Sequence, residues 1–95
     1  MLKYFAVTAI ALMSVAAAHA QSSLVQQGHA VADRACNACH LKGTIEAPSF
    51  AALAKRGTVT EAGLGDALGH GHEMSPITLL PEERRALAAY INSLK

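Results

Sequence analysis

Residues 34–43 read RACNACHLKG and hold both cysteines of the 95-residue chain. Cys36 and Cys39 are separated by two residues, and His40 follows directly after the second cysteine. Two thiols and an imidazole this close together are side chains that bind metals or carry redox chemistry. The interpretation of this motif therefore depends on what the rest of the chain provides.

The first 20 residues, MLKYFAVTAIALMSVAAAHA, have the pattern of a secretory signal peptide. Lys3 precedes an apolar run that ends in Ala-His-Ala at residues 18–20. A basic start, a short apolar core and an A-x-A end are the features of such peptides. The run is shorter than the roughly 20 apolar residues of a membrane span, which disfavours an uncleaved anchor. We therefore expect residues 1–20 to be removed, and residues 21–95 to form one periplasmic domain without stable membrane insertion.

The expected mature chain is short and electrically balanced. Removing 20 of the 95 residues leaves 75, and without Lys3 seven basic side chains stand against seven acidic ones. No basic tract points to nucleic acid or to an anionic membrane surface. A domain of this size buries a small core and usually needs a disulfide, a metal or another cofactor for stability. A disulfide between Cys36 and Cys39 would close a very short loop and would stabilise little.

The periodicity of the mature chain predicts an all-α domain, and no segment alternates as a strand does. The expected helices are one over residues 23–38, a short one capped by Ser49 and ending before Gly57, a weaker one capped by Thr60, and a last one that begins at Pro81. Proline suits the first position of a helix. Within the last helix, Leu87, Ile91 and Leu94 form an apolar stripe that predicts packing against the core.

Three chemistries use a Cys-x-x-Cys pair, and each makes its own demand on the chain. A redox dithiol lies at the start of a helix beside a strand, whereas this motif ends a predicted helix. A structural zinc site needs four ligands, and the remaining candidates, His70 and His72, are separated by a single residue. A covalent haem anchor needs Cys-x-x-Cys-His as it stands, with His40 as the proximal iron ligand. The expected export signal agrees with this third interpretation, which we favour.

A haem with two protein ligands needs a second axial residue. Met74 is the single methionine of the expected mature chain, and it lies 34 residues after His40, in a loop with glycines and a proline. Ligation by histidine and methionine is typical of c-type electron carriers, so we expect Met74 to bind the iron. The alternatives are ligation by His70 or His72, or a methionine that fills a gap in the core.

Residues 22–95 resemble a class I c-type cytochrome, a small monohaem electron carrier. Gly28 stands eight residues before the first cysteine, as in that family, where this glycine lets the N-terminal helix cross an aromatic residue of the C-terminal helix. Tyr90 matches that aromatic residue. Pro48 matches the proline whose carbonyl accepts a hydrogen bond from the proximal imidazole, and Met74 matches the distal ligand.

The resemblance implies a cytochrome c-like fold, in which the N- and C-terminal helices cross around one covalently bound haem c. It implies electron transfer between redox partner proteins, as a soluble carrier or as the cytochrome subunit of a dehydrogenase, rather than an enzymatic reaction. The sequence departs from the family at Ala32, where an aromatic residue is usual, at Ser75, which separates Met74 from the next proline, and in having no tryptophan. If Met74 left the iron, the same fold would suit a peroxidase or a gas sensor.

Several apolar residues are available to surround a haem: Val31, Ile45, Phe50, Leu53, Leu64, Leu68, Ile77, Leu87 and Ile91. Among them we expect Phe50, Leu53 and Leu68 to be cofactor contacts. The basic pairs at residues 55–56 and 84–85 are interpreted as solvated helix faces, because charged side chains at such positions mostly face water.

Overall fold

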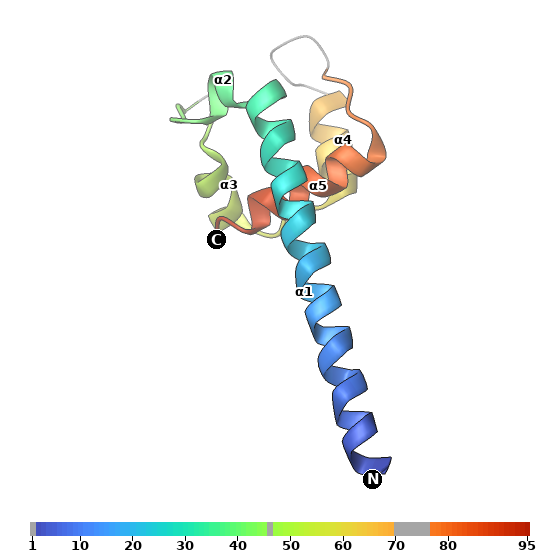
Figure 1. Cartoon of the computed structure of the whole chain (residues 1–95). Coiled ribbons are helices and arrows are strands. Elements are labelled where there is room, and N and C mark those ends of the chain that lie inside the picture. Colours follow the sequence, from blue (N-terminus) through green and yellow to red (C-terminus); the bar gives the residue numbers. More distant parts are fainter. Residues whose placement is uncertain (1, 46, 70–76) are drawn as a thin grey trace.

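The computed structural model describes residues 2–45, 47–69 and 77–95, with side chains from residue 19 onward, and every regular element in these ranges is a helix. The elements follow one another as α1 (Leu2–Ala35), α2 (Asn37–His40), α3 (Phe50–Arg56), α4 (Glu61–Gly69) and α5 (Pro81–Asn92), as Figure 1 shows. The prediction of an all-α chain is confirmed.

Helix α1 is longer than the sequence pattern predicts. It runs without interruption from the expected signal peptide into the domain, and its N-terminal part projects away from the other helices (Figure 1). The expected helix over residues 23–38 is therefore wrong at its start, and it is interrupted at Cys36. Residues 2–27 contain no glycine or proline and are rich in alanine, so nothing in the sequence stops the helix there. Among the described residues, no helix has both the length and the apolar character that crossing a membrane requires.

Gly28 lies where α1 crosses α5. A Cβ atom at this position would stand 2.0 Å from the carbonyl oxygen of Ala86 and 2.7 Å from Cβ of Tyr90. These distances are far below van der Waals contact, so a side chain does not fit at residue 28. The expected close crossing of Gly28 against Tyr90 is confirmed.

The core lies between α5, the C-terminal part of α1, and the two short helices α3 and α4. Its buried members are Val31, Ala32, Cys36, Phe50, Ala54, Leu68, Leu79, Leu87 and Ile91. The predicted stripe of α5 supplies the largest fully buried side chains, Leu87 and Ile91, each 1% exposed.

The prediction that Ile45 helps to surround a haem is wrong, because its side chain is 96% exposed and lies outside the core. The backbone N–H of Thr44 donates to the carbonyl of Ala47 at 2.8 Å, and the N–H of Ala47 donates to Oγ1 of Thr44 at 3.0 Å. This pair of hydrogen bonds closes a turn, and Ile45 lies on the turn facing water.

Helices α3, α4 and α5 begin where the sequence predicts, and α3 ends before Gly57 as predicted. Ser49 Oγ accepts from the N–H of Ala52 at 3.2 Å at the start of α3, and Thr60 Oγ1 accepts from the N–H of Gly63 at 3.0 Å at the start of α4. Pro81 is the first residue of α5. These caps satisfy backbone donors that lack partners in the first turn of a helix.

Candidate functional site

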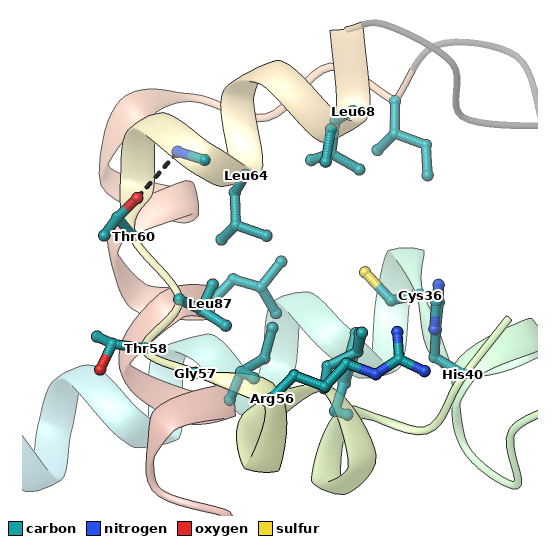
Figure 2. Close-up of a pocket in the computed structure, with 16 residues that line it drawn as sticks. Cys36, His40, Arg56, Gly57, Thr58, Thr60, Leu64, Leu68 and Leu87 are labelled. Carbon is teal, nitrogen blue, oxygen red and sulfur yellow. Dashed lines mark hydrogen bonds between the residues drawn. The ribbon is translucent and has the colours of Figure 1, made fainter.

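A cavity of about 460 Å³ lies among the helices, and its size is that of a small-molecule site. Figure 2 shows the residues that line it. They are Cys36, His40, Phe50, Leu53, Arg56, Gly57, Thr58, Val59, Thr60, Gly63, Leu64, Ala67, Leu68, Ile77, Leu87 and Ile91. Most of these side chains are apolar, so the cavity suits a ligand with large apolar surfaces.

The cysteine motif reaches the cavity through helix α2. The N–H of His40 donates to the carbonyl of Cys36 at 3.1 Å, which closes one helical turn. Residues four apart in a helix lie on the same side, and both Cys36 and His40 line the cavity. Cys39 stands next to His40 with an exposed side chain and is not among the lining residues.

Contacts with Pro48 and Phe50 hold the ring of His40. Its Nδ1 lies 2.6 Å from the carbonyl oxygen of Pro48, and its ring stacks on Phe50 with 4.9 Å between ring centroids and 9° between planes. A carbonyl oxygen can only accept a hydrogen bond, so Nδ1 carries the proton and donates a hydrogen bond to the carbonyl of Pro48. In the neutral imidazole the lone pair is then on Nε2, which leaves this atom able to bind a metal.

Cys36 is a buried thiol. Burial raises the pKa of Cys36 above its ordinary value, against a smaller opposite effect of the charge on Arg34. The side chain is therefore protonated at neutral pH. No disulfide joins Cys36 to Cys39, both of which lie in the described part of the chain.

The predicted contacts Phe50, Leu53 and Leu68 all line the cavity. They come from α3 and α4, which turn these apolar side chains toward the cavity. Pro48 contributes its backbone carbonyl rather than its ring. The structure therefore brings together these four predicted residues with His40.

Arg56 is exposed, as predicted for a solvated helix face, but it also lines the cavity, which the sequence does not indicate. It is the last residue of α3, and it is the one permanently charged side chain among the described residues that line the cavity. Its side chain runs along the cavity toward His40 (Figure 2). A cation at the border of an apolar cavity is suited to pair with an anionic group of a ligand.

Asn92 holds the segment that connects α3 to α4. Its Oδ1 accepts from the N–H of Val59 at 2.9 Å, and its Nδ2 donates to the carbonyl of Val59 at 2.8 Å. Val59 lines the cavity, so Asn92 fixes this part of the wall from α5. The two residues are 33 positions apart, and no local pattern in the sequence signals their contact.

The predicted axial ligand Met74, and the alternatives His70 and His72, lie outside the described residues. Within the described ranges, no group of three or more His, Cys, Asp and Glu side chains is arranged to hold a metal ion. Leu68 and Ile77 are described residues that precede and follow these three positions in the sequence, and both line the cavity.

Comparison with protein-family models, with curated proteins and with solved structures finds no match. The function proposed below therefore rests on the residues of this chain and on the cavity they form.

Proposed function

We propose that this chain is an electron carrier of the c-type cytochrome kind, with one covalently bound haem c and a periplasmic location. The observation that carries the proposal is the state of His40. This residue lies at the wall of an apolar cavity, beside Cys36, and donates from Nδ1 to the carbonyl of Pro48. Metal-ligating histidines characteristically donate their second ring nitrogen to such an acceptor, which fixes the ring and raises its basicity.

The residues that line the cavity suit the apolar faces of a haem, and Cys39, the second expected anchor, stands next to His40 outside this lining. Cys36 and Cys39 would form the thioether links, and His40 would bind the iron through Nε2. Phe50 packs against the imidazole and would exclude water from that face. Arg56 would pair with the carboxylates of the porphyrin, because guanidinium and carboxylate form charge-assisted hydrogen bonds.

Haem supplies a one-electron couple between Fe(II) and Fe(III) when it is bound. With His40 and Met74 as its two ligands, both axial positions would be filled by the protein, and no position for a substrate would remain at the metal. This is the arrangement of electron carriers whose potential is raised by a methionine ligand. Redox proteins are then the expected partners, one as donor and one as acceptor.

The state of Cys36 disfavours a redox dithiol. Reactive cysteines of that class have a lowered pKa, since the thiolate is the nucleophile. Burial instead raises the pKa of Cys36. A zinc site would need ligands from outside the described residues, because those residues contain no suitable group.

Expression of the full chain in a bacterium that attaches haem c in its periplasm tests the proposal. The purified protein is expected to hold haem that stays bound after denaturation, at the mass of the chain without residues 1–20 plus one haem. Cys36→Ser and Cys39→Ser should each remove one thioether link. Ala38→Ser, a matched control between the two cysteines, should retain both. A wild-type chain without covalent haem would refute the proposal.

The axial ligand is tested separately. Ferric haem with a methionine ligand has a weak absorption band in the red, which Met74→Ala should abolish, while His70→Ala and His72→Ala should keep it. Survival of the band in Met74→Ala would exclude Met74 as the ligand. Ready binding of carbon monoxide by the reduced wild-type protein would favour the peroxidase or sensor function, because it requires Met74 to leave the iron.

A further inference from the structure

The contacts of His40 with Pro48 and Phe50 come from one short segment of the chain. The carbonyl of Pro48 accepts from Nδ1, and the ring of Phe50 lies parallel to the imidazole, with 9° between the two planes. Pro48 and Phe50 are two residues apart, where the chain enters α3. The hydrogen bond fixes one atom of the imidazole, and the stacked ring fixes its plane. The orientation of His40 therefore depends in part on what holds the ring of Phe50.

Tyr90, on α5, packs against the ring of Phe50. The two rings lie edge to face, with 6.4 Å between centroids and 89° between planes, which is a favourable arrangement of aromatic side chains. Phe50 is 8% exposed and lines the cavity, whereas Tyr90 does not line it. Tyr90 therefore contacts the proposed haem site only through the ring that stacks on the imidazole.

Tyr90 is itself held in place by α1. The ring of His29 stacks on the ring of Tyr90, with 4.8 Å between centroids and 8° between planes. At the neighbouring Gly28 the two helices approach so closely that a Cβ atom there would stand 2.7 Å from Cβ of Tyr90. These rings therefore form one line of contacts that runs from an exposed side chain to the imidazole of His40.

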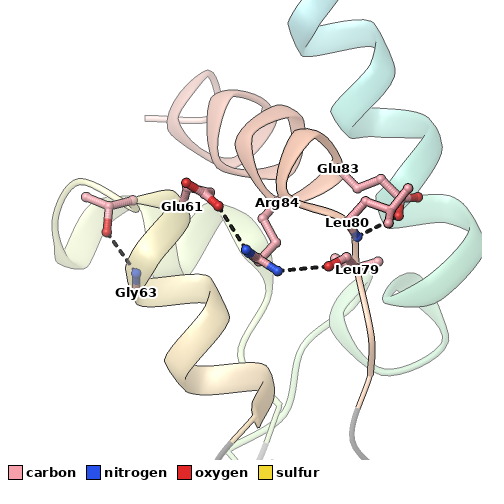
Figure 3. Close-up of polar contacts among 7 residues, drawn as sticks. Glu61, Gly63, Leu79, Leu80, Glu83 and Arg84 are labelled. Atoms are coloured by element: carbon pink, nitrogen blue, oxygen red, sulfur yellow. Dashed lines mark hydrogen bonds and ion pairs between the residues drawn. The ribbon is translucent and has the colours of Figure 1, made fainter.

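The helix that carries Tyr90 is fastened before and after this residue. Arg84 donates from Nη1 to the carbonyl of Leu79 at 2.8 Å and from Nη2 to Oε1 of Glu61 at 3.0 Å, as Figure 3 shows. Two residues after Tyr90, the amide of Asn92 makes its two hydrogen bonds with the segment between α3 and α4. The backbone of α5 is therefore a fixed support for the ring at position 90.

We propose that Tyr90 is a positioning residue for His40 in the proposed haem site. Acting through Phe50, it fixes the plane of the imidazole about the bond that Nε2 would form with the iron. The inference rests on the proposed function and extends it to a residue outside the cavity lining. The ring of Tyr90 makes both aromatic contacts, so Tyr90→Phe should keep the role and Tyr90→Leu should lose it.

Proton NMR of the ferric, haem-loaded protein in excess cyanide tests this role. Cyanide fills the sixth position of the iron, so the only axial ligand that the protein then supplies is the proximal imidazole. The plane of that imidazole determines how the unpaired electron is distributed over the porphyrin, and so the order of the haem methyl shifts. Tyr90→Phe should give the order of the wild type, and Tyr90→Leu should change it.

The exchange of the Nδ1 proton of His40 with solvent is a second readout. An edge-to-face aromatic pair changes an equilibrium constant by up to about tenfold. At one pH, exchange should therefore be up to about tenfold faster in Tyr90→Leu, because the ring that stacks on the imidazole is held less firmly. Tyr90→Phe should exchange at the rate of the wild type.

Leu94→Ala separates positioning from general loss of stability. Leu94 packs against the same core from the end of the chain, has no ring and does not line the cavity. If Leu94→Ala changes the methyl shifts as Tyr90→Leu does at equal loss of stability, the proposal is overturned. It is also overturned if Tyr90→Leu keeps either the methyl order or the exchange rate of the wild type.

Tyr90→Met takes the place of Tyr90→Leu if the latter does not fold. Methionine fills irregular gaps in a core but has no ring, so the same changes are expected. A wild-type chain without covalent haem would instead refute the proposed function before any variant is compared, and the role of Tyr90 would fall with it.

Discussion

At residue 28 the crossing of α1 and α5 leaves no space for a methyl group. The nearest atoms to a Cβ there belong to the backbone of Ala86, and backbone atoms of a packed helix do not yield as a flexible side chain does. Gly28→Ala therefore requires the two helices to move apart. We expect it to lower the free energy of unfolding by about 3 kcal/mol, at the upper end of the range for overpacked sites. Urea unfolding followed by circular dichroism measures this loss.

Gly65 provides the matched control for this prediction, because it is also a glycine inside a helix. A Cβ atom at Gly65 would meet Nε of Arg84 at 3.5 Å, which is ordinary contact. Gly65→Ala should leave stability unchanged or raise it by up to about 1 kcal/mol through helix propensity. Equal losses in Gly28→Ala and Gly65→Ala would show that the crossing is not the cause.

Between elements, α1 and α5 are also joined by an ion pair of Arg34 with Glu83. The hydrogen bond from Arg34 lowers the pKa of Glu83, and the N–H of Leu80, which donates to Glu83 Oε1 at 2.9 Å, lowers it further. A lowered carboxyl pKa means that the ionised form stabilises the fold. This stabilisation is present above the unfolded pKa, about 4.3 for glutamate, and is lost as pH falls through the lower folded value.

Glu83→Gln should therefore be less stable than the wild type at pH 7, and the difference should shrink as the pH falls below about 4, the range in which glutamate titrates. Urea unfolding across this pH range measures both curves. Glu82→Gln is the control, because Glu82 is the exposed residue that precedes it on α5. A constant difference between Glu83→Gln and wild type at all pH values would contradict the assignment.

At the scale of the whole molecule, the sequence predicts what depends on neighbours along the chain. Ser49, Thr60 and Pro81 define helix starts through side chains that act within one turn, and all three positions are as predicted. The contact of Asn92 with Val59 spans 33 residues and that of Arg84 with Glu61 spans 23. Such contacts depend on the packing of separate helices, and no local periodicity encodes them.

The same distinction between local patterns and contacts of separate helices applies to the candidate site. Cys36 and His40 are recognisable from their spacing, and Phe50 from its place at the start of a capped helix. The prediction for Ile45 is wrong because this residue lies on a turn that faces water. The position of Arg56 at the cavity depends on how α3 packs against it. Hydrophobicity and charge indicate neither of these two orientations.

The N-terminal part of α1 projects from the rest of the molecule, which predicts that the domain does not need it. Residues 19–23 are exposed, and half-buried side chains begin at Leu24. A chain that begins at Gln21 should lose well under about 1 kcal/mol of stability. Because about 1 kcal/mol corresponds to some 4–8 °C at this size, its thermal midpoint should stay within a few degrees of that of the full chain. A clearly lower midpoint would mean that residues 1–20 contribute to the packing.

The uninterrupted course of α1 through the expected cleavage point has a consequence for the mature protein. Cutting after Ala20 would place a new α-amino group at Gln21, in the middle of what is one helix here. That group is largely protonated at neutral pH, and a positive charge is unfavourable at the N-terminal, positive end of the helix dipole. The amides of residues 21–24 would also lose their carbonyl acceptors in the removed segment. The first turn of the mature helix should then fray as far as Leu24, where burial begins, and maturation would set the length of the helix that crosses α5.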